Sequence, residues 1–260
     1  MEWTHPDKEL FEKKKADFDF NFEIIKERIA EAAKISGREQ RDIKLLAATK
    51  TVSPELINYG LEKGIELIGE NRVQELLSKK DELNTDKEHT HFIGHLQTNK
   101  INMLLPHVSM IESVGSIHLA EEISKKCIAA GTVMPVLMEV NVGEEISKSG
   151  IAPSEAESAF EQMLSLGGIK VMGLMSIPPA CENPDDARRY FSTIYKLFVD
   201  IKDKNRDNKD IMYLSMGMSG DYYEAISEGA NIVRIGSALF GKRIYKKLIF
   251  INGGNRLWVL

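Results

Sequence analysis

The chain contains little cysteine and no long apolar run. Its two cysteines, Cys127 and Cys181, lie far apart among 260 residues and lack the spacing of a metal site. A disulfide framework is therefore not expected, and a reducing, cytoplasmic location is the simplest prediction. No apolar run approaches the length of a membrane span. The first residues, "MEWTHPDKELFEKKK", are polar and lack the apolar segment of a secretory signal.

Net positive charge is also lacking. Lysine and arginine together number 34, aspartate and glutamate number 39, and the formal net charge at pH 7 is -5. Proteins that bind nucleic acids generally are usually basic, so we expect no nucleic-acid partner. The hydrophobic fraction of 43% is sufficient for a large core. These values predict a globular protein, most simply a monomer, that binds neither nucleic acid nor membrane.

Short apolar runs alternate with amphipathic segments along most of the chain. Apolar residues at helical spacing predict a first helix over 18–37, which ends at a glycine. The strand-like runs that follow are 43–49, 65–70, 90–95, 109–114, 134–142, 169–177, 211–217 and 231–237. The helical patterns between them include 54–64, 71–83, 117–131, 153–166 and 185–205.

This alternation predicts the fold class. Eight strand-like runs, each followed by a possible helix, predict an α/β fold in the form of a single (β/α)8 TIM barrel with an extra N-terminal helix. An open, doubly wound sheet is the alternative, since it has the same local pattern. A G-x-G-x-x-G sequence after the first strand would favour that sheet, and none is present. We expect the barrel to occupy residues 1–243 and a C-terminal extension to occupy 244–260.

A lysine closely follows the first strand-like run. In barrels of this kind, functional residues collect at the carboxyl ends of the strands. Side chains alternate along a strand, so Leu46 and Ala48 would face the lumen and Lys50 would stand at its mouth. A lysine there either extends into solvent or, where its surroundings lower its pKa, acts as a nucleophilic amine.

Glycine- and serine-rich turns follow the last two strands. The seventh run continues as "LSMGMSGDYYEAI", which places Ser219 and Gly220 at the start of a helix. The eighth continues as "VRIGSALFG", in which Gly236 permits a close backbone approach and Ser237 begins a helical stretch. Free N–H groups at helix starts bind anions, and this pair of loops often holds phosphate in barrels. The alternative is that both turns serve only as helix caps.

Arg234 lies inside the apolar run "NIVRIGSALF" and shares strand parity with Gly236. A buried guanidinium requires a partner, because an unpaired charge in the core is very costly. That partner is either a structural carboxylate, such as Glu139, or an acceptor on a bound ligand. A strand-end lysine, a phosphate cradle and an inward arginine together suggest pyridoxal 5'-phosphate (PLP) as a cofactor.

Seven sequence motifs carry a family resemblance. In order they are "LLAATKT", "IGENRVQE", "HFIGHLQTNK", "SKSGI", "GLMSIPP", "LSMGMSGDYYEAI" and "VRIGSALFG". With them the chain resembles the YggS/PROSC family of pyridoxal phosphate homeostasis proteins, from the first helix to about Arg243. The barrel of that family is similar to the N-terminal domain of alanine racemase, a fold-type III PLP enzyme.

The resemblance implies roles for individual residues. It implies that Lys50 carries the cofactor as a Schiff base, the internal aldimine. The residues implied to hold the rest of the cofactor are Ser219, Gly236 and Ser237 at the phosphate, Arg234 at the pyridine nitrogen and Asn71 at a wall of the pocket.

The resemblance also implies a function in intracellular PLP homeostasis. Alanine racemase-like chains add a β-rich domain that supplies a tyrosine base to the partner subunit, and the sequence beyond the expected barrel is too short for one. An arginine opposite the ring nitrogen would keep that nitrogen unprotonated and make the ring a weaker electron sink. We therefore expect a cofactor carrier or regulator that serves PLP-dependent client enzymes, without catalysis of its own. The alternative is a fold-type III PLP enzyme acting on amino acids, similar to a racemase.

Three histidines alternate in "EHTHFIGH", namely His89, His91 and His95. Such spacing can indicate a metal site, but no cysteine accompanies them. A structural or pocket-lining role is the favoured interpretation, and we predict no metal.

The C-terminal tail breaks the strand–helix alternation. In "KKLIFINGGNRLWVL", a turn sequence separates two apolar groups, which predicts a hairpin with Ile249 and Ile251 opposite Leu257 or Val259. The alternative is a frayed or irregular end, since an isolated hairpin is marginally stable in water.

Overall fold

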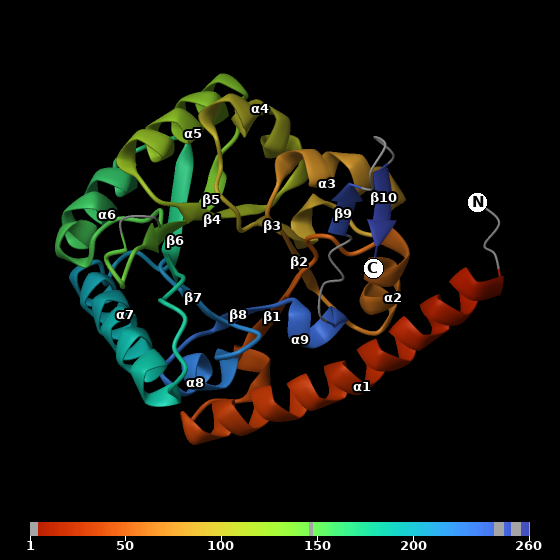
Figure 1. The fold of residues 1–260 in the computed structure, drawn as a ribbon. Helices are drawn as coiled ribbons and strands as arrows, with labels where there is room; N and C mark the ends of the chain where they lie inside the picture. Colours follow the sequence, from red (N-terminus) through yellow and green to blue (C-terminus); the bar gives the residue numbers. More distant parts are fainter. Residues whose placement is uncertain (1–4, 146–147, 242–246, 251–255, 260) are drawn as a thin grey trace.

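The structure is a computed structural model that describes residues 5–145, 148–241, 247–250 and 256–259, with side chains for 7–145 and 148–241. Strands β1 to β8 pair in sequence order, and β1 pairs with β8 to close a parallel barrel (Figure 1). The predicted TIM barrel is therefore confirmed, and the open sheet is excluded. The strands are β1 Lys44–Ala48, β2 Leu67–Glu70, β3 Thr90–Phe92, β4 Met110–Val114, β5 Met134–Val140, β6 Ile169–Ser176, β7 Tyr213–Met218 and β8 Ile232–Ile235.

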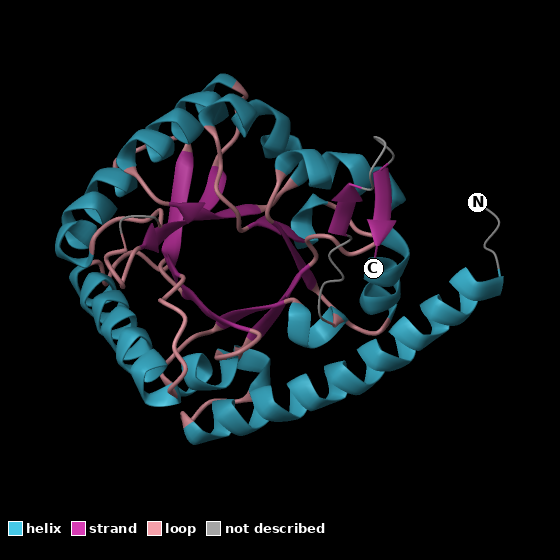
Figure 2. Ribbon diagram, in the orientation of Figure 1, coloured by secondary structure: helices cyan, strands magenta, loops and turns pink. Residues whose placement is uncertain are grey.

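Helices surround the barrel on its outside (Figure 2). They are α1 His5–Ile35, α2 Pro54–Glu62, α3 Val73–Lys79, α4 Ile101–Leu104, α5 Ile117–Ala129, α6 Ala156–Leu164, α7 Pro184–Lys204, α8 Tyr222–Ser227 and α9 Ser237–Phe240. Each predicted strand or helix overlaps one of these elements, and apart from the start of α1 its ends are shifted by a few residues.

The N-terminal helix α1 is longer than predicted. It begins at His5 rather than near residue 18, and it runs along the outside of the barrel past α2, α8 and α9 (Figure 1). Its first half has few apolar residues, so periodicity gave no signal there, although lysine and glutamate are good helix formers. Lys15 pairs with Glu12 of the same helix at 3.0 Å, and it joins this half to α2, because its Nζ lies 5.0 Å from the ring centre of Tyr59.

The buried core has two parts, inside and outside the barrel wall. The larger cluster lies between the strands and the helices and includes Ala47 of β1. A smaller cluster contains Leu46 of β1 and Ile232 of β8, with Ala48 packed against it. Alternate residues of a closed barrel face its lumen, so this smaller cluster lies in the lumen, as does a second one of Met110, Leu137 and Met175. Leu46 and Ala48 thus face inward as predicted, and Lys50 follows them at the mouth.

The C-terminal tail contains the predicted hairpin. Strands β9 Lys247–Phe250 and β10 Arg256–Val259 pair in antiparallel fashion, with Leu257 opposite Ile249. Ile251 and the turn at 252–255 lie outside the described residues.

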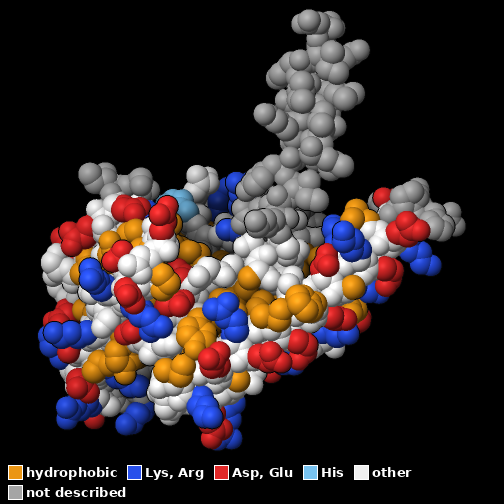
Figure 3. Space-filling view, turned by 60° about the horizontal axis from the view of Figure 1, so that its bottom comes forward, with side chains coloured by type: hydrophobic (Ala, Val, Ile, Leu, Met, Phe, Trp, Pro, Cys, Tyr) orange, Lys and Arg blue, Asp and Glu red, His pale blue; other side chains and the backbone are white. Residues whose placement is uncertain are grey.

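Charges are mixed on the molecular surface. On the face in Figure 3, basic and acidic side chains alternate over the described residues without a broad area of either sign. This face therefore lacks the continuous basic track that a nucleic-acid backbone requires. In the part of the chain that the structure describes, no helix has both the length and the apolar character to cross a membrane.

Candidate functional site

A cavity of about 220 Å³ lies at the barrel mouth, between the segments that follow β1 and β8. Lys50, Gly236 and Ser237 line it, together with Lys14 from α1. The pairing of β1 with β8 brings these distant parts of the sequence together. Three of the residues predicted to bind the cofactor therefore meet at one cavity.

Ser219 links the turn after β7 to the turn after β8. Its hydroxyl oxygen accepts hydrogen bonds from the backbone N–H of Gly236 at 3.2 Å and of Ala238 at 3.1 Å. The sequence predicted Ser219 at the start of a helix, but helix α8 begins at Tyr222, so Ser219 lies in the turn before that helix. Two of the residues predicted to hold phosphate, Ser219 and Gly236, thus lie together in one polar cradle, in which the N–H groups of Gly236 and Ala238 bond the Ser219 hydroxyl.

Gly236 makes a close contact with β1. A Cβ atom at this position would lie 3.1 Å from the carbonyl oxygen of Ala48 and 3.3 Å from its Cβ. Both distances are shorter than ordinary van der Waals contacts. A side chain at Gly236 would therefore push the cradle away from the strand that precedes Lys50.

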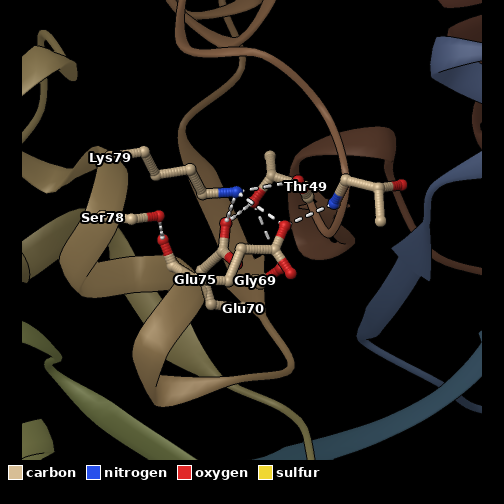
Figure 4. Close-up of polar contacts among 7 residues, drawn as sticks. Thr49, Gly69, Glu70, Glu75, Ser78 and Lys79 are labelled. Atoms are coloured by element: carbon tan, nitrogen blue, oxygen red, sulfur yellow. Dashed lines mark hydrogen bonds and ion pairs between the residues drawn. The ribbon is translucent and has the colours of Figure 1, made fainter. Parts of the chain in front are cut away.

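The residue before Lys50 is held by a buried ion pair (Figure 4). Lys79 of α3 places its Nζ 2.6 Å from a carboxylate oxygen of Glu70 and donates a hydrogen bond to the backbone carbonyl of Thr49 at 3.0 Å. The Thr49 hydroxyl donates to the same Glu70 oxygen. The side chain of Lys79 is 6% exposed and that of Glu70 is fully buried. The end of β1 is therefore fixed to α3 and β2.

The residue after Lys50 is held from the same helix. The backbone N–H of Thr51 donates to the carboxylate of Glu75, which also lies 3.3 Å from the Nζ of Lys79. Thr51 has a φ of 63°, in the left-handed region that β-branched residues rarely occupy. This conformation costs on the order of 1–2 kcal/mol, and the Glu75 bond offsets part of it. Lys50 thus lies in a segment that is clamped on both sides.

Burial changes the acidity of Glu70. Loss of solvent raises its pKa, the charge and hydrogen bond of Lys79 and the bond from Thr49 lower it, and the net pKa lies above the usual value. Its Oε2 atom is buried without a hydrogen-bond partner among the described residues. An unpaired buried carboxylate oxygen is costly, which agrees with the raised pKa.

Asn71 directly follows β2, where the sequence predicted a pocket wall. Its side-chain Oδ1 is buried and has no hydrogen-bond partner within the described residues. Gly94 presses against its backbone, since a Cβ on Gly94 would lie 2.1 Å from the Asn71 carbonyl oxygen. The position of the Asn71 backbone is thus fixed, and Asn71 is not among the residues that line the cavity.

Arg234 lies in the lumen, almost fully buried. Its Nη1 donates to the Ser215 hydroxyl at 2.7 Å and its Nη2 to the Ser176 carbonyl at 2.9 Å. Burial lowers its pKa, which the charges of Glu112, Glu139 and Asp221 partly oppose. Glu139, the structural partner considered from the sequence, accepts its hydrogen bonds from Ser149 instead and affects Arg234 only through its charge.

The histidines of "EHTHFIGH" differ in exposure. His91 is buried and bonds Glu112 through Nδ1 at 2.6 Å, whereas His89 and His95 are exposed. Among the described residues, no three histidine, cysteine, aspartate or glutamate side chains are grouped as metal ligands.

Sequence analysis missed the residues that support Lys50 and Arg234. Glu70 and Lys79 appear in the sequence as ordinary members of a strand end and an amphipathic helix. Glu112 had a usable signal, because a carboxylate in the middle of the apolar run "SMIESV" must find a partner when the strand is buried. The partners themselves come from other strands and could not be identified from spacing.

Comparison with known proteins identifies the family. The family model described as "Alanine racemase, N-terminal domain" matches residues 21–244. A "Pyridoxal phosphate homeostasis protein" of Aquifex aeolicus is 45% identical over 85% of this chain and 96% of its own length. A protein of the same description from Pseudomonas aeruginosa is 36% identical over 86% of this chain and 95% of its own.

Solved structures agree with this comparison. PipY of Synechococcus elongatus, solved "with PLP bound", has a TM-score of 0.69 at 27% identity. The match covers 82% of this chain and 100% of PipY. An alanine racemase of Clostridium difficile shares only the fold, with a TM-score of 0.65 at 15% identity, over 88% of this chain and 57% of its own. From the sequence matches over most of its length, this chain belongs to the family of pyridoxal phosphate homeostasis proteins.

Proposed function

We propose that the chain binds PLP at the barrel mouth and serves intracellular PLP homeostasis by holding and releasing it. The observation that carries the proposal is the meeting of Lys50, Gly236 and Ser237 at one cavity, with the Ser219 hydroxyl bonded to the backbone N–H of Gly236. The names of the relatives and the PLP-bound structure of PipY support the same ligand. When bound, PLP supplies an aldehyde that condenses with an amine and releases water.

Each part of PLP has a matching group in the chain. Lys50 provides the amine, in a segment whose flanking residues Thr49 and Thr51 are held by Lys79 and Glu75. The hydroxyls of Ser219 and Ser237 and the backbone around Gly236 suit a phosphate, whose oxygens accept several hydrogen bonds. The groups assigned to the ring are Arg234 at the pyridine nitrogen and Asn71 at the wall, where its unpartnered oxygen fits a surface that a ligand completes.

A carrier role follows from the chemistry of Arg234. A guanidinium has donors only, and the charges of Glu112, Glu139 and Asp221 support its positive form. A ring nitrogen that accepts from it carries no proton and withdraws electrons weakly. A ring that is a weaker electron sink is less suited to amino-acid chemistry on PLP. We therefore assign cofactor binding and transfer to client enzymes, rather than turnover of amino acids, to this site.

Absorption spectroscopy and chemical trapping test the assignment of Lys50. Protein loaded with PLP should absorb in the near-visible, and borohydride should leave the cofactor attached to Lys50 on peptide mapping. Lys50→Ala should lose this attachment and still fold, because a side chain at a cavity mouth contributes little packing. Lys44→Ala is the matched control, since Lys44 lies at the opposite end of the same strand and is exposed. Attachment to another lysine in the wild-type chain, or no uptake of PLP, would refute the proposal.

The fold-type III enzyme is the competing function. Incubating the loaded protein with a panel of L-amino acids, while following product chirality and the cofactor spectrum, separates the two. The carrier should show no sustained turnover. Continued racemisation or decarboxylation would show that the protein is an enzyme and not a carrier.

The proposal also covers location, assembly and boundaries. It places the protein in the cytoplasm as a monomer that delivers PLP to PLP-dependent enzymes. It assigns residues 1–243 to the cofactor-binding barrel and 244–260 to an extension, because the family model matches residues 21–244. Sedimentation of the full chain, with and without PLP, tests the monomer.

A further inference from the structure

A chain of hydrogen bonds crosses the lumen beneath the barrel mouth. Arg234 of β8 bonds Ser215 of β7 at 2.7 Å, and the Ser215 hydroxyl bonds one carboxylate oxygen of Glu112 in β4 at 2.6 Å. The other Glu112 oxygen bonds Nδ1 of His91 in β3, also at 2.6 Å. Four strands therefore contribute one residue each to a continuous polar path.

The path has a fixed direction of donation. Arg234 can only donate, so the Ser215 oxygen accepts from it, and the single Ser215 proton goes to Glu112. An ionised Glu112 can only accept, so it receives one hydrogen bond from Ser215 and one from His91, whose proton then resides on Nδ1. The donor and the acceptor of each hydrogen bond are thus determined by the neighbouring groups, and only one pattern of donation is possible.

The surroundings favour an ionised Glu112. Burial alone would raise its pKa, but the hydrogen bond and charge of His91, the charge of Arg234 and the bond from Ser215 outweigh burial and lower the pKa below the usual value. The side chain of Glu112 is fully buried, and neither Ser215 nor His91 is more than 6% exposed. With so little water available, these bonds are stronger than exposed ones.

Two other acidic groups affect Arg234 without bonding to it. Glu139 of β5 is bonded to Ser149 and feels the charge of His95, while Asp221, in the turn before α8, accepts from the backbone of Met218. Burial raises the pKa of both carboxyls. They therefore contribute charge to Arg234, whereas the path through Ser215 contributes orientation.

We propose that Glu112 and Ser215 are positioning residues for Arg234, with His91 holding Glu112 in place. Ser176 of β6 fixes one guanidinium nitrogen and Ser215 fixes the other, so the two together set the plane of the group. The proposal rests on the assignment of Arg234 to the PLP ring nitrogen. It adds that Glu112, Ser215 and His91 determine the orientation of the Arg234 guanidinium toward the ring nitrogen.

The first test uses the cofactor-free protein, so it does not depend on PLP binding. Nitrogen NMR of the wild-type chain should show a proton held on Nδ1 of His91 and resolved, slowly rotating Nη groups on Arg234. Ser215→Ala and Glu112→Gln should merge the Arg234 signals, and Ser215→Thr, which retains the hydroxyl, should restore them. Unchanged Arg234 signals in both folded variants would overturn the proposal.

The second test measures the bound cofactor across a pH series. Ser215→Ala removes the hydroxyl between Arg234 and Glu112, so Arg234 should move toward Glu112. The cofactor spectrum and its pH titration should shift. PLP affinity should fall about tenfold, the effect of one lost hydrogen bond to a charged group. Glu139→Gln is the matched control, because it removes a nearby charge that is not hydrogen-bonded to Arg234. Equal spectral shifts in Glu139→Gln and Ser215→Ala would refute positioning through the path. Failure of the wild-type chain to bind PLP would instead refute the proposed function, and the NMR result would stand.

Discussion

The buried pair of Lys79 and Glu70 provides a quantitative test of how the Lys50 segment is held. Lys79→Met keeps the length of the side chain and removes its charge. Removing one partner of a buried ion pair typically costs about 3–5 kcal/mol, because the other charge stays buried. Glu70 can reduce this cost by taking up a proton, since burial already raises its pKa.

Protonation sets an upper limit on the charge-related cost. With an unfolded-state pKa of about 4.3 and about 1.4 kcal/mol per pH unit, neutralising Glu70 costs about 3.7 kcal/mol near pH 7 and about 1 kcal/mol near pH 5. Lys79→Met raises the folded-state pKa of Glu70 further, so stability is lost as pH rises and regained as pH falls. The variant should therefore lose about 3–4 kcal/mol near neutral pH and much less in mild acid.

Urea unfolding of the cofactor-free protein at both pH values measures this loss, provided that the m-value is unchanged. Lys80→Met is the matched control. Lys80 is the next residue and pairs with Asp81 at 2.6 Å, but Asp81 is 82% exposed, so the loss should be about 0–1 kcal/mol. The double variant Lys79→Met, Glu70→Gln should recover part of the stability. Equal losses in Lys79→Met and Lys80→Met, or a loss independent of pH, would show that the pair does not hold this segment.

Three further predictions concern the cradle, the lumen and the tail. Gly236→Ala should weaken PLP affinity without unfolding the chain, because its Cβ would lie 3.1 Å from the Ala48 carbonyl oxygen; calorimetric titration measures this, and unchanged affinity would contradict the close contact. The pKa of Glu112 is lower in the folded than in the unfolded protein, so its ionised form stabilises the fold at neutral pH, and this stability is lost as pH falls through the folded-state pKa. Thermal melts of Glu112→Gln should therefore differ from those of the wild type at neutral pH and approach them in acid. Truncation after Arg243 should leave PLP affinity intact, since every residue predicted to bind the cofactor precedes it, and a large loss would place the boundary later in the chain.

The barrel could be predicted from the sequence because its signals are local. Runs such as 134–142 are apolar, long enough for a strand and bounded by helical patterns, so each βα unit is visible by itself. The parity of Leu46 and Ala48 needs only strand geometry, and the lumen cluster confirms it. The start of α1 was missed because its first half is stabilised by charged side chains and by contact with Tyr59, neither of which produces periodicity.

The supports of the site could not be predicted, because their partners come from different strands. Arg234 visibly required a partner, but Glu139 and Ser215 are equally compatible with the alternation of their strands. The choice depends on the register between strands, which shifts between β7 and β8 and places Met218 opposite Arg234. Likewise, the unusual φ of Thr51 follows from the Glu75 bond and has no signature in the sequence around it.

The cavity lies at the seam where the barrel closes on itself. Lys50 follows the first strand and Gly236 follows the last, and these strands pair with Leu46 opposite Arg234. Contacts between such distant parts of a chain are slow to form, because closing the intervening loop costs entropy. During synthesis Lys50 emerges early, and the cradle of Ser219 and Gly236 emerges late. A ligand that needs both can bind only a chain whose ring is complete, so occupancy of the site selectively stabilises finished barrels over partly assembled ones.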